Sequence, residues 1–291
     1  MIFFITCVII IKIMKTKPFI SKIELTNDGE LSLFFIGTGS AFSKINFQTN
    51  FLIIKGQEHI LVDCGSLCPY ALETEYNTRI GEIKNILLTH PHADHIAGVE
   101  EMALVGYYVT RSKANMIITD EFKKKLWNQS LRGGIQYSEN GKMTFDDYFV
   151  QLKPELIQKK PFQIFETTVG SVNLKLFRTR HVTTRKDSLK QSQISYGLII
   201  DNKVLFSGDT QFNPAQLDFI MKNYDIEVIF HDCDFSGYSE GVHASYKQLL
   251  TLPAEMRKKM YLCHYNSSAE RASPVEDGFA GFTKPGVYYS F

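Results

Sequence analysis

The sequence has almost no net charge and few cysteines. Its 32 lysines and arginines nearly balance its 31 aspartates and glutamates, which leaves a formal net charge of +1. A chain without a global positive field does not gather a long polyanion, so we expect no duplex nucleic acid as a partner. The five cysteines form an odd, sparse set, unlike the dense disulfide framework of a small secreted domain. This composition favours reduced thiols and a cytoplasmic location.

Long apolar runs are also scarce. Residues 1–13 are apolar, but the run before Lys12 has about half of the ~20 residues that a membrane span requires. It has neither a basic leader nor a small-residue cleavage site. Because Met14-Lys-Thr-Lys17 reads like a start of translation, we treat residues 1–22 as an N-terminal extension of uncertain role. A membrane contact through residues 1–13 is the alternative.

Short apolar runs separated by glycine and other turn residues occupy the rest of the chain. They predict buried strands in two β-rich halves, and helical periodicity lies between them. The predicted strands cover residues 31–36, 50–54, 59–64, 83–89, 112–119, 172–177, 196–200, 204–206, 228–230 and 260–263, and the predicted helices cover 70–80, 97–109 and 245–250. This order implies a layered α/β architecture, which we assign to one domain over residues 23–291. Residues 121–163 break the pattern and are interpreted as an insertion near the site.

The positions of the histidines indicate a metal site. Three of the eight lie in His90-Pro-His-Ala-Asp-His95, directly after a predicted buried strand, whereas His59 looks incidental. In extended backbone His90 and His92 point to one side, and Asp94 and His95 come from the next turn, which suits two adjacent cations. Imidazole and carboxylate donors fit zinc, manganese or iron at an open site, and a pair of such ions is typical of hydrolases. Asp209 is the expected bridge, although its Ser-Gly-Asp-Thr surroundings also fit an ordinary turn.

Several motifs, in order along the chain, resemble the metallo-β-lactamase fold. They are Thr38-Gly-Ser-Ala41, Val62-Asp-Cys-Gly65, Thr89 to His95, His181, Ser207-Gly-Asp-Thr210 and Leu262-Cys-His264. The resemblance implies a four-layer αββα sandwich with a dinuclear site at one edge. Carried over by position, one ion would bind His90, His92, His181 and Asp209, and the other would bind Asp94, His95, Asp209 and His264. The ions would be divalent, with zinc as the first choice and manganese as the alternative.

Within that superfamily the chain is similar to the ribonuclease Z branch of phosphodiesterases. The similarity lies in His231-Asp-Cys-Asp-Phe235, Val242-His-Ala-Ser245 and Leu262-Cys-His-Tyr265. It implies that His243 is a general acid, that Asp232 stabilises the imidazolium, and that Asp94 orients or deprotonates the attacking water. A surface histidine at a helix start and a strand-end carboxylate are the alternative readings of His243 and Asp232.

One departure from the branch points to a small substrate. Ribonuclease Z enzymes that process tRNA carry a long arm between the ligands that correspond to His181 and Asp209, and here these residues are only 28 positions apart (209 − 181). No such arm fits, so a cyclic or other small nucleotide is the expected substrate. Small enzymes of the anti-Pycsar type are similar in size and layout, which implies cyclic nucleotide hydrolysis by a homodimer.

Three other functions stay open at this point. They are an endoribonuclease acting on RNA, a metallohydrolase of thioesters or lactones, and a binding protein that sequesters a nucleotide. Substrate contacts are harder to predict. Arg178, Arg180, Arg185 and Lys186 could contact phosphate or form a solvated basic loop. The aromatic residues of the insertion, Tyr137, Tyr148 and Phe149, could stack on a base, but packing is the expected role.

Overall fold

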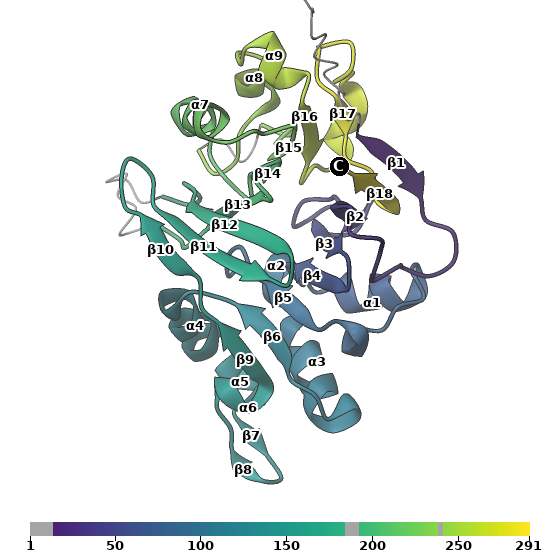
Figure 1. Ribbon diagram of the computed structural model, residues 1–291, viewed down its shortest axis with the longest axis vertical. Helices are drawn as coiled ribbons and strands as arrows, with labels where there is room; N and C mark the ends of the chain where they lie inside the picture. Colours follow the sequence, from purple (N-terminus) through teal and green to yellow (C-terminus); the bar gives the residue numbers. More distant parts are fainter. Residues whose placement is uncertain (1–13, 184–191, 238–240) are drawn as a thin grey trace, which may run out of the picture.

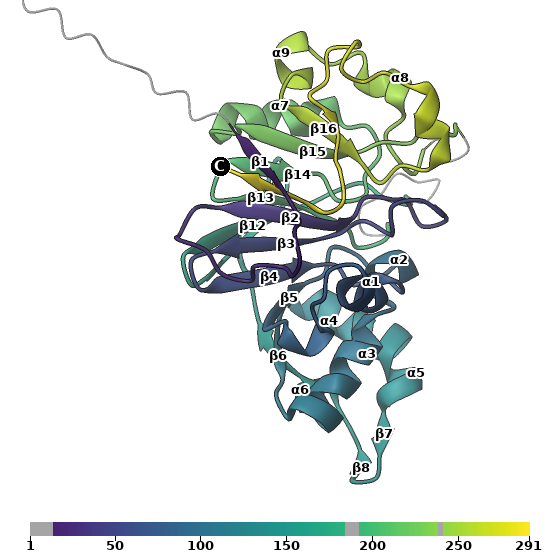
Figure 2. The same ribbon diagram turned by 90° about the vertical axis from the view of Figure 1, so that its right-hand side faces the viewer.

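Two β-sheets packed face to face form the centre of the molecule. The computed structural model describes residues 14–183, 192–237 and 241–291. Helices cover the outer face of each sheet, so the four layers run helix, sheet, sheet, helix (Figure 1, Figure 2). The predicted four-layer αββα sandwich is therefore confirmed.

The first sheet has eight strands and joins the two ends of the described chain. In spatial order they are β1 (Lys15–Pro18), β18 (Val287–Ser290), β2 (Ser32–Gly37), β3 (Asn50–Lys55), β4 (Glu58–Val62), β5 (Asn85–Leu87), β6 (Ala114–Ile117) and β9 (Phe149–Leu152). Pairing is antiparallel from β1 to β4 and parallel from β4 to β9. The parallel strands aim their carboxyl ends at one edge, where the histidine hexapeptide begins.

The second sheet also has eight strands and repeats this division. In spatial order they are β10 (Glu155–Gln158), β11 (Ile164–Val169), β12 (Val172–Arg178), β13 (Tyr196–Ile200), β14 (Val204–Phe206), β15 (Val228–Asp232), β16 (Met260–Cys263) and β17 (Gly281–Phe282). Pairing is antiparallel from β10 to β14 and parallel from β14 to β17. The carboxyl ends of β14, β15 and β16 lie together, next to those of the first sheet.

Phenylalanines hold the two sheets together. Phe35 of β2 lies 4.9 Å, between ring centroids, from Phe51 of β3 and from Phe230 of β15, and Phe51 lies 4.8 Å from Phe206 of β14. All four side chains are buried. Because offset and edge-on ring contacts add to the free energy of burial, this cluster fixes the spacing of the sheets, and with it the distance between the residues that each sheet sends to its edge.

Short helices cover both outer faces. Below the first sheet lie α1 (Cys68–Thr74), α2 (Ala93–Ile96), α3 (Val99–Leu104), α4 (Asp120–Leu126), α5 (Arg132–Ile135) and α6 (Phe145–Tyr148), and above the second lie α7 (Pro214–Asn223), α8 (Tyr246–Leu249) and α9 (Ala254–Arg257). The predicted helix over residues 70–80 is too long, since α1 ends at Thr74. Asn77 takes a left-handed backbone conformation (φ 49°), and the Thr78 N–H returns to the Leu72 carbonyl at 2.8 Å.

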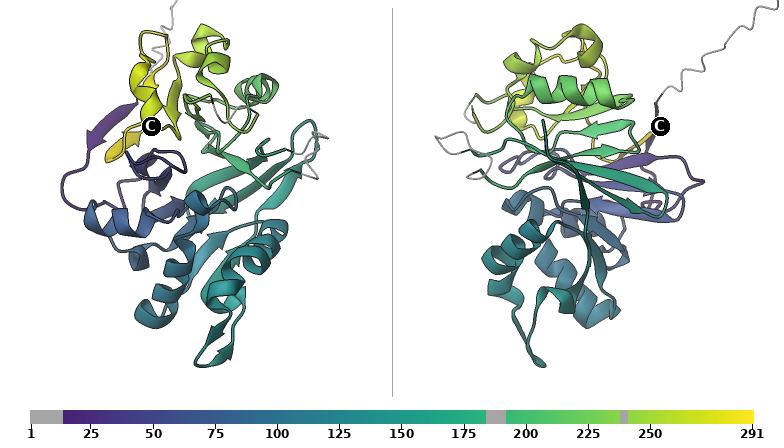
Figure 3. Two further views of the ribbon diagram at one scale, coloured as in Figure 1. Left: turned by 180° about the vertical axis from the view of Figure 1, so that it is seen from behind. Right: turned by 60° about the vertical axis from the view of Figure 1, so that its left-hand side comes forward.

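Residues 121–163 contribute to both sheets. Their carboxyl-terminal part forms the edge strand β9 of the first sheet and the edge strand β10 of the second, so the chain crosses between the sheets here. Before β9 a hairpin of β7 (Tyr137–Ser138) and β8 (Gly141–Lys142) projects beyond the helices at one end of the long axis (Figure 3). That this segment is an insertion over the site stays a prediction.

Candidate metal centre

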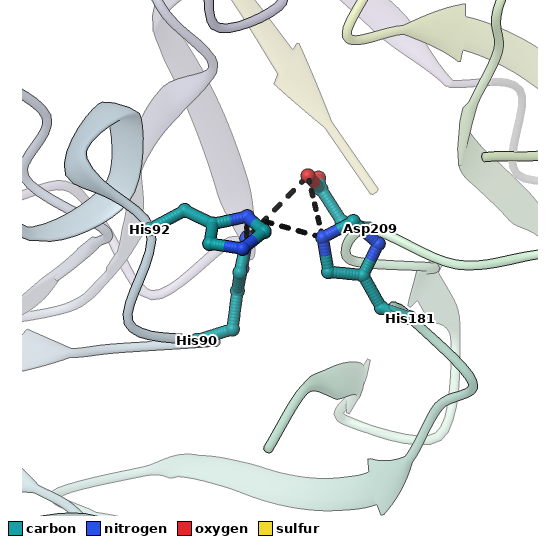
Figure 4. A group of neighbouring side chains, drawn as sticks. All are labelled: His90, His92, His181 and Asp209. Atoms are coloured by element: carbon teal, nitrogen blue, oxygen red, sulfur yellow. Dashed lines mark hydrogen bonds and ion pairs between the residues drawn. The ribbon is translucent and has the colours of Figure 1, made fainter. Parts of the chain in front are cut away.

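The first group of potential ligands joins both sheets. His90 and His92 follow β5, His181 follows β12, and Asp209 follows β14, and their donor atoms all lie within 4.8 Å of one another. His92 Nδ1 is 3.1 Å from both His90 Nε2 and His181 Nε2, and Asp209 Oδ2 is 3.5 Å from His90 Nε2. Figure 4 shows the two histidines of the first sheet facing His181 and Asp209 of the second.

The second group shares Asp209 with the first. Asp94 and His95 lie in the single turn of α2, and His264 follows β16 with a left-handed backbone (φ 58°). Asp94 Oδ2 lies 3.1 Å from His95 Nε2 and 3.3 Å from His264 Nε2. Asp209 Oδ2 lies 3.5 Å and 3.4 Å from the same two nitrogens. All seven residues expected as ligands therefore converge in two adjoining groups.

Both groups fit divalent cations. His95 Nε2 is buried and has no hydrogen-bond partner among the described residues, although a buried polar atom normally has one. Burial favours the neutral form of Asp209, but the neighbouring His264, His95 and His90 hold the pKa of this carboxyl well below its usual range. Burial lowers the pKa of His181 to about 4, which keeps the imidazole neutral and able to bind a metal. Nitrogen and carboxylate oxygen donors without thiolates suit zinc, manganese or iron.

Asp63 is a functional residue to which the sequence analysis assigned no role. It follows β4 in a left-handed conformation (φ 62°) and accepts hydrogen bonds from the Thr89 N–H, the Thr89 hydroxyl and His95 Nδ1, each at 2.7 Å. The Thr89 hydroxyl gives its proton to Asp63, so it accepts one from His90 Nδ1 at 3.0 Å. His90 and His95 thus both present Nε2 as the lone-pair nitrogen, one for each group. Its position in the sequence, an acidic residue directly after a predicted buried strand, could have indicated this role.

His243 and Asp232 form the predicted pair beside the two groups. His243 Nδ1 donates to Asp232 Oδ2 at 2.7 Å, and the His243 ring centroid lies 5.0 Å from that of His181 and 4.9 Å from that of His264. Burial alone would lower the pKa of His243, but the Asp232 carboxylate raises it above its usual value. Because Nδ1 is bound to Asp232, Nε2 is the nitrogen left to exchange a proton with a substrate.

The neighbouring residue His231 points away from the two ligand groups. It is buried on the other face of β15, where it lines the small space beneath α7 with Gln216 and Leu217. Its Nδ1 lies 2.7 Å from the Asp232 carbonyl oxygen. His59 also belongs to neither ligand group and accepts the Lys84 N–H at 3.1 Å. Both are structural histidines, whereas the other six converge.

A cavity of about 300 Å³ opens beside His243 and His264. Its other walls are the turn after β2, with Ser40 and Phe42, and the residues after β15 and β16, with Asp234 and Asn266. This volume is at the lower end of the range for small-molecule sites in proteins. Through His264 the second ligand group therefore borders, together with His243, a space that can hold a compact molecule.

Some of the residues predicted to contact substrate are buried, some are exposed, and two lie outside the described residues. Arg178 is buried, its guanidinium stacks 5.5 Å from the Tyr196 ring centroid, and it does not face solvent, while Arg180 is exposed. Arg185 and Lys186 lie outside the described residues. The aromatic side chains Tyr148 and Phe149 are buried, as expected for packing, whereas Tyr137 on the hairpin is 73% exposed.

The chain matches a known protein family over most of its length. The family model described as "Anti-Pycsar protein Apyc1" matches residues 31–289. The chain belongs to the anti-Pycsar protein Apyc1 family. A relative of that name from Paenibacillus xerothermodurans is 31% identical over 261 residues, which cover 90% of this chain and 98% of the relative. Another, from Bacillus phage vB_BsuM-Goe3, is 33% identical over 246 residues, which cover 82% of this chain and 90% of the relative.

Solved structures with the same fold are more distant in sequence. The metallo-β-lactamase fold protein YhfI from Bacillus subtilis superposes with a TM-score of 0.63 at 16% identity, covering 90% of this chain and 100% of YhfI. The short form of human tRNase Z superposes with a TM-score of 0.57 at 14% identity, covering 88% and 98%. These likenesses confirm the fold of this Apyc1 family member.

Family membership, the fold and the donor groups together confirm the coarser prediction that the protein is a metal-dependent hydrolase. None of the helices in the described part of the chain combines the length and the apolar character that crossing a bilayer takes. The proposed membrane contact through residues 1–13 lies outside the described residues.

Proposed function

We propose that the protein is a dinuclear phosphodiesterase that hydrolyses a cyclic or other small nucleotide. The single observation that carries this proposal is the shared carboxylate of Asp209, which lies within ligand distance of both groups while the His243–Asp232 pair lies beside them. Two ligand groups with a common bridge suit the two-ion hydrolysis of phosphate esters, and an acid beside them suits a leaving group that needs a proton.

Each residue has a defined part in this scheme. Divalent ions bound by the two groups would supply an activated water and would stabilise charge on the phosphoryl oxygens. Asp94 would orient that water or take its proton. His243 would donate its Nε2 proton to the sugar oxygen as the bond from phosphorus to that oxygen breaks. Asp232, 2.7 Å from His243 Nδ1, would stabilise the charged imidazolium before the transfer.

Three observations support a small nucleotide as the substrate. Only 28 residues separate His181 from Asp209, so the segment that grips tRNA in related enzymes has no counterpart here. The net charge of +1 does not favour binding of a long polyanion. The relatives carry the name anti-Pycsar protein, and the resemblance of this chain to enzymes of that type implies cyclic nucleotide hydrolysis.

The proposal extends to the ions, the assembly and the location. Zinc is the first choice for both positions and manganese the second, since both accept imidazole and carboxylate ligands. We further propose a homodimer, which light scattering coupled to size-exclusion chromatography would measure directly. The four described cysteines are buried free thiols, which suits the reducing cytoplasm.

A substrate panel tests the proposed function. The purified chain, loaded with zinc or with manganese, would be incubated with 3′,5′-cyclic nucleotides, linear dinucleotides, a pre-tRNA, a thioester and a lactone. We expect linear nucleoside monophosphates from the cyclic nucleotides, loss of this activity after chelation, and recovery when metal returns.

Other outcomes of the panel would replace the proposal. Cleavage of the pre-tRNA at its 3′ end without turnover of cyclic nucleotides would favour an endoribonuclease. Turnover of the thioester or the lactone alone would favour a carbonyl hydrolase. Tight binding of a nucleotide without any product from the metal-loaded protein would favour a sequestering protein.

A further inference from the structure

Phe42 is an exposed aromatic residue on a turn that the fold holds in place. Its side chain is 89% exposed, the highest value among the large apolar residues in the described ranges. The turn is tied to the residue after the ligand His264, since the Ser40 N–H donates to the Tyr265 carbonyl at 3.0 Å. The Tyr265 hydroxyl also accepts from the Thr38 hydroxyl at 3.1 Å and from Asn46 Nδ2 at 3.3 Å. Phe42 is therefore presented to solvent by an anchored turn.

The cavity beside Phe42 also contains His243. Its walls bring together Phe42, the imidazole of His243 and the polar side chains of Ser40 and Asn266. Asn266 Oδ1 accepts the Ser268 N–H at 2.9 Å, which leaves the amide Nδ2 as a donor. Within residues 14–183, 192–237 and 241–291, neither Asn266 Nδ2 nor the Ser40 hydroxyl has a hydrogen-bond partner. An aromatic face and two uncommitted polar groups thus border one space.

The proposed chemistry determines which part of a nucleotide would enter this space. His243 gives its proton to a sugar oxygen, so the sugar lies on the His243 side of the phosphorus atom. The base is attached to that sugar and follows it away from the ligand groups. The cavity of about 300 Å³ lies on this side and is bordered by Phe42.

We infer that this cavity is the nucleobase site, in which Phe42 stacks on the base while Asn266 Nδ2 and the Ser40 hydroxyl hydrogen-bond its edge. This inference rests on the proposed function and adds a binding role for residues that are not metal ligands. Every base has a face that can stack, and ring nitrogens or carbonyls of purines and pyrimidines can accept from an amide. The site therefore binds nucleotides of several bases with similar affinity.

A pair of ligands that differ only in the base tests the inference without turnover. Adenosine 5′-monophosphate and ribose 5-phosphate would be titrated calorimetrically into the metal-loaded wild type, Phe42→Ala and Phe42→Trp. We expect the wild type to bind the nucleotide about tenfold more tightly than the sugar phosphate, the order expected for one stacked base. Phe42→Ala loses this preference, and Phe42→Trp keeps it. Ile20→Ala, which shortens another exposed apolar side chain, serves as the control and keeps it too.

Two results would overturn the inference. One is a wild type that binds both ligands equally, and the other is a Phe42→Ala variant that retains the preference or weakens both ligands alike. If the wild type hydrolyses cyclic nucleotides, Phe42→Ala also raises KM about tenfold and leaves kcat within about twofold. If no phosphodiester is hydrolysed, the proposed function fails, and the comparison of the two ligands still decides whether a base binds here.

Discussion

The two sheets supply the candidate centre in different ways. The first sheet contributes four donors from six consecutive residues, His90 to His95, at the end of β5 and in the turn of α2. The second contributes donors singly, with His181, Asp209 and His264 at the ends of three different strands. A local sequence determines the first half of the centre, and the register of a sheet determines the second.

The register of β15 against β16 has the largest effect on the geometry of the centre. In the parallel ladder Asp232 lies opposite Cys263, the residue before His264, and this brings Asp232 beside the ligand groups. His231, one position earlier, faces the opposite layer beneath α7. A shift of one residue would exchange these two side chains, because successive residues of a strand point to opposite faces. The geometry of the second half of the centre therefore depends on the register of the strands, whereas the first half depends on one short segment of the chain.

The largest effect is expected for the residue that joins the halves. Asp209→Ala removes the carboxylate shared by both ligand groups, so both ions are lost and turnover falls by about a thousandfold or more. Metal analysis by mass spectrometry and steady-state rates would measure this. Asp218→Ala, an exposed carboxylate of α7 paired with Lys222, is the matched control and keeps both ions. Retention of both ions by Asp209→Ala would refute the bridge.

His243→Ala tests the chemistry that the second sheet adds. We expect kcat for a cyclic nucleotide to fall by about 10²- to 10⁴-fold with the metal content unchanged, because the sugar alkoxide leaves poorly without a proton. With bis(p-nitrophenyl) phosphate the loss is much smaller, since p-nitrophenolate needs no proton to leave. An equal loss on both substrates would contradict the role of general acid.

Asp63→Asn tests the support of the first half. One oxygen of the carboxylate accepts the Thr89 N–H, and the other accepts both the Thr89 hydroxyl and His95 Nδ1. An amide keeps only one of these oxygens and puts an NH2 group in place of the other, so one set of donors loses its acceptor and the two histidines lose their fixed tautomers. Metal affinity should fall about 10- to 100-fold, as titration against a competing chelator would measure. Asp218→Asn is the control. Unchanged affinity in Asp63→Asn would mean that Asp63 only supports the fold.

Asp232→Asn gives the smallest expected effect and completes the comparison. The neutral amide no longer stabilises the His243 imidazolium, so kcat for a cyclic nucleotide falls about tenfold. The metal content stays the same, unlike that of Asp63→Asn. Loss of an ion from Asp232→Asn would instead assign Asp232 to the ligands, since its carboxylate also lies close to Asp209 and His264.

This contrast also explains what the sequence could predict. The spacing of His90, His92 and His95 indicated a metal site without any knowledge of the fold, because neighbouring residues on a short loop must lie close together. His181, Asp209 and His264 were identified only through the order of motifs that resembles a known fold. The role of Asp63 was missed because its contacts with Thr89 and His95 arise only when β4 and β5 pair.

The cavity and the end of helix α1 could not be predicted from the sequence, because both depend on contacts between distant parts of the chain. Phe42 and His243 are about 200 positions apart, and no local pattern indicates that they border one space. The helix predicted over residues 70–80 ended early because Tyr76 packs inward and its hydroxyl donates to the Ile36 carbonyl at 3.0 Å. Such tertiary contacts override helical periodicity.

Metal stoichiometry tests the central claim, a two-ion centre built from both sheets, most directly. The wild type, His90→Ala and His264→Ala would be loaded with zinc, dialysed against metal-free buffer and analysed by mass spectrometry. We predict two ions per chain for the wild type and one for each variant, since each substitution removes a ligand from only one group. A single ion in the wild type, or two ions in either variant, would contradict the account.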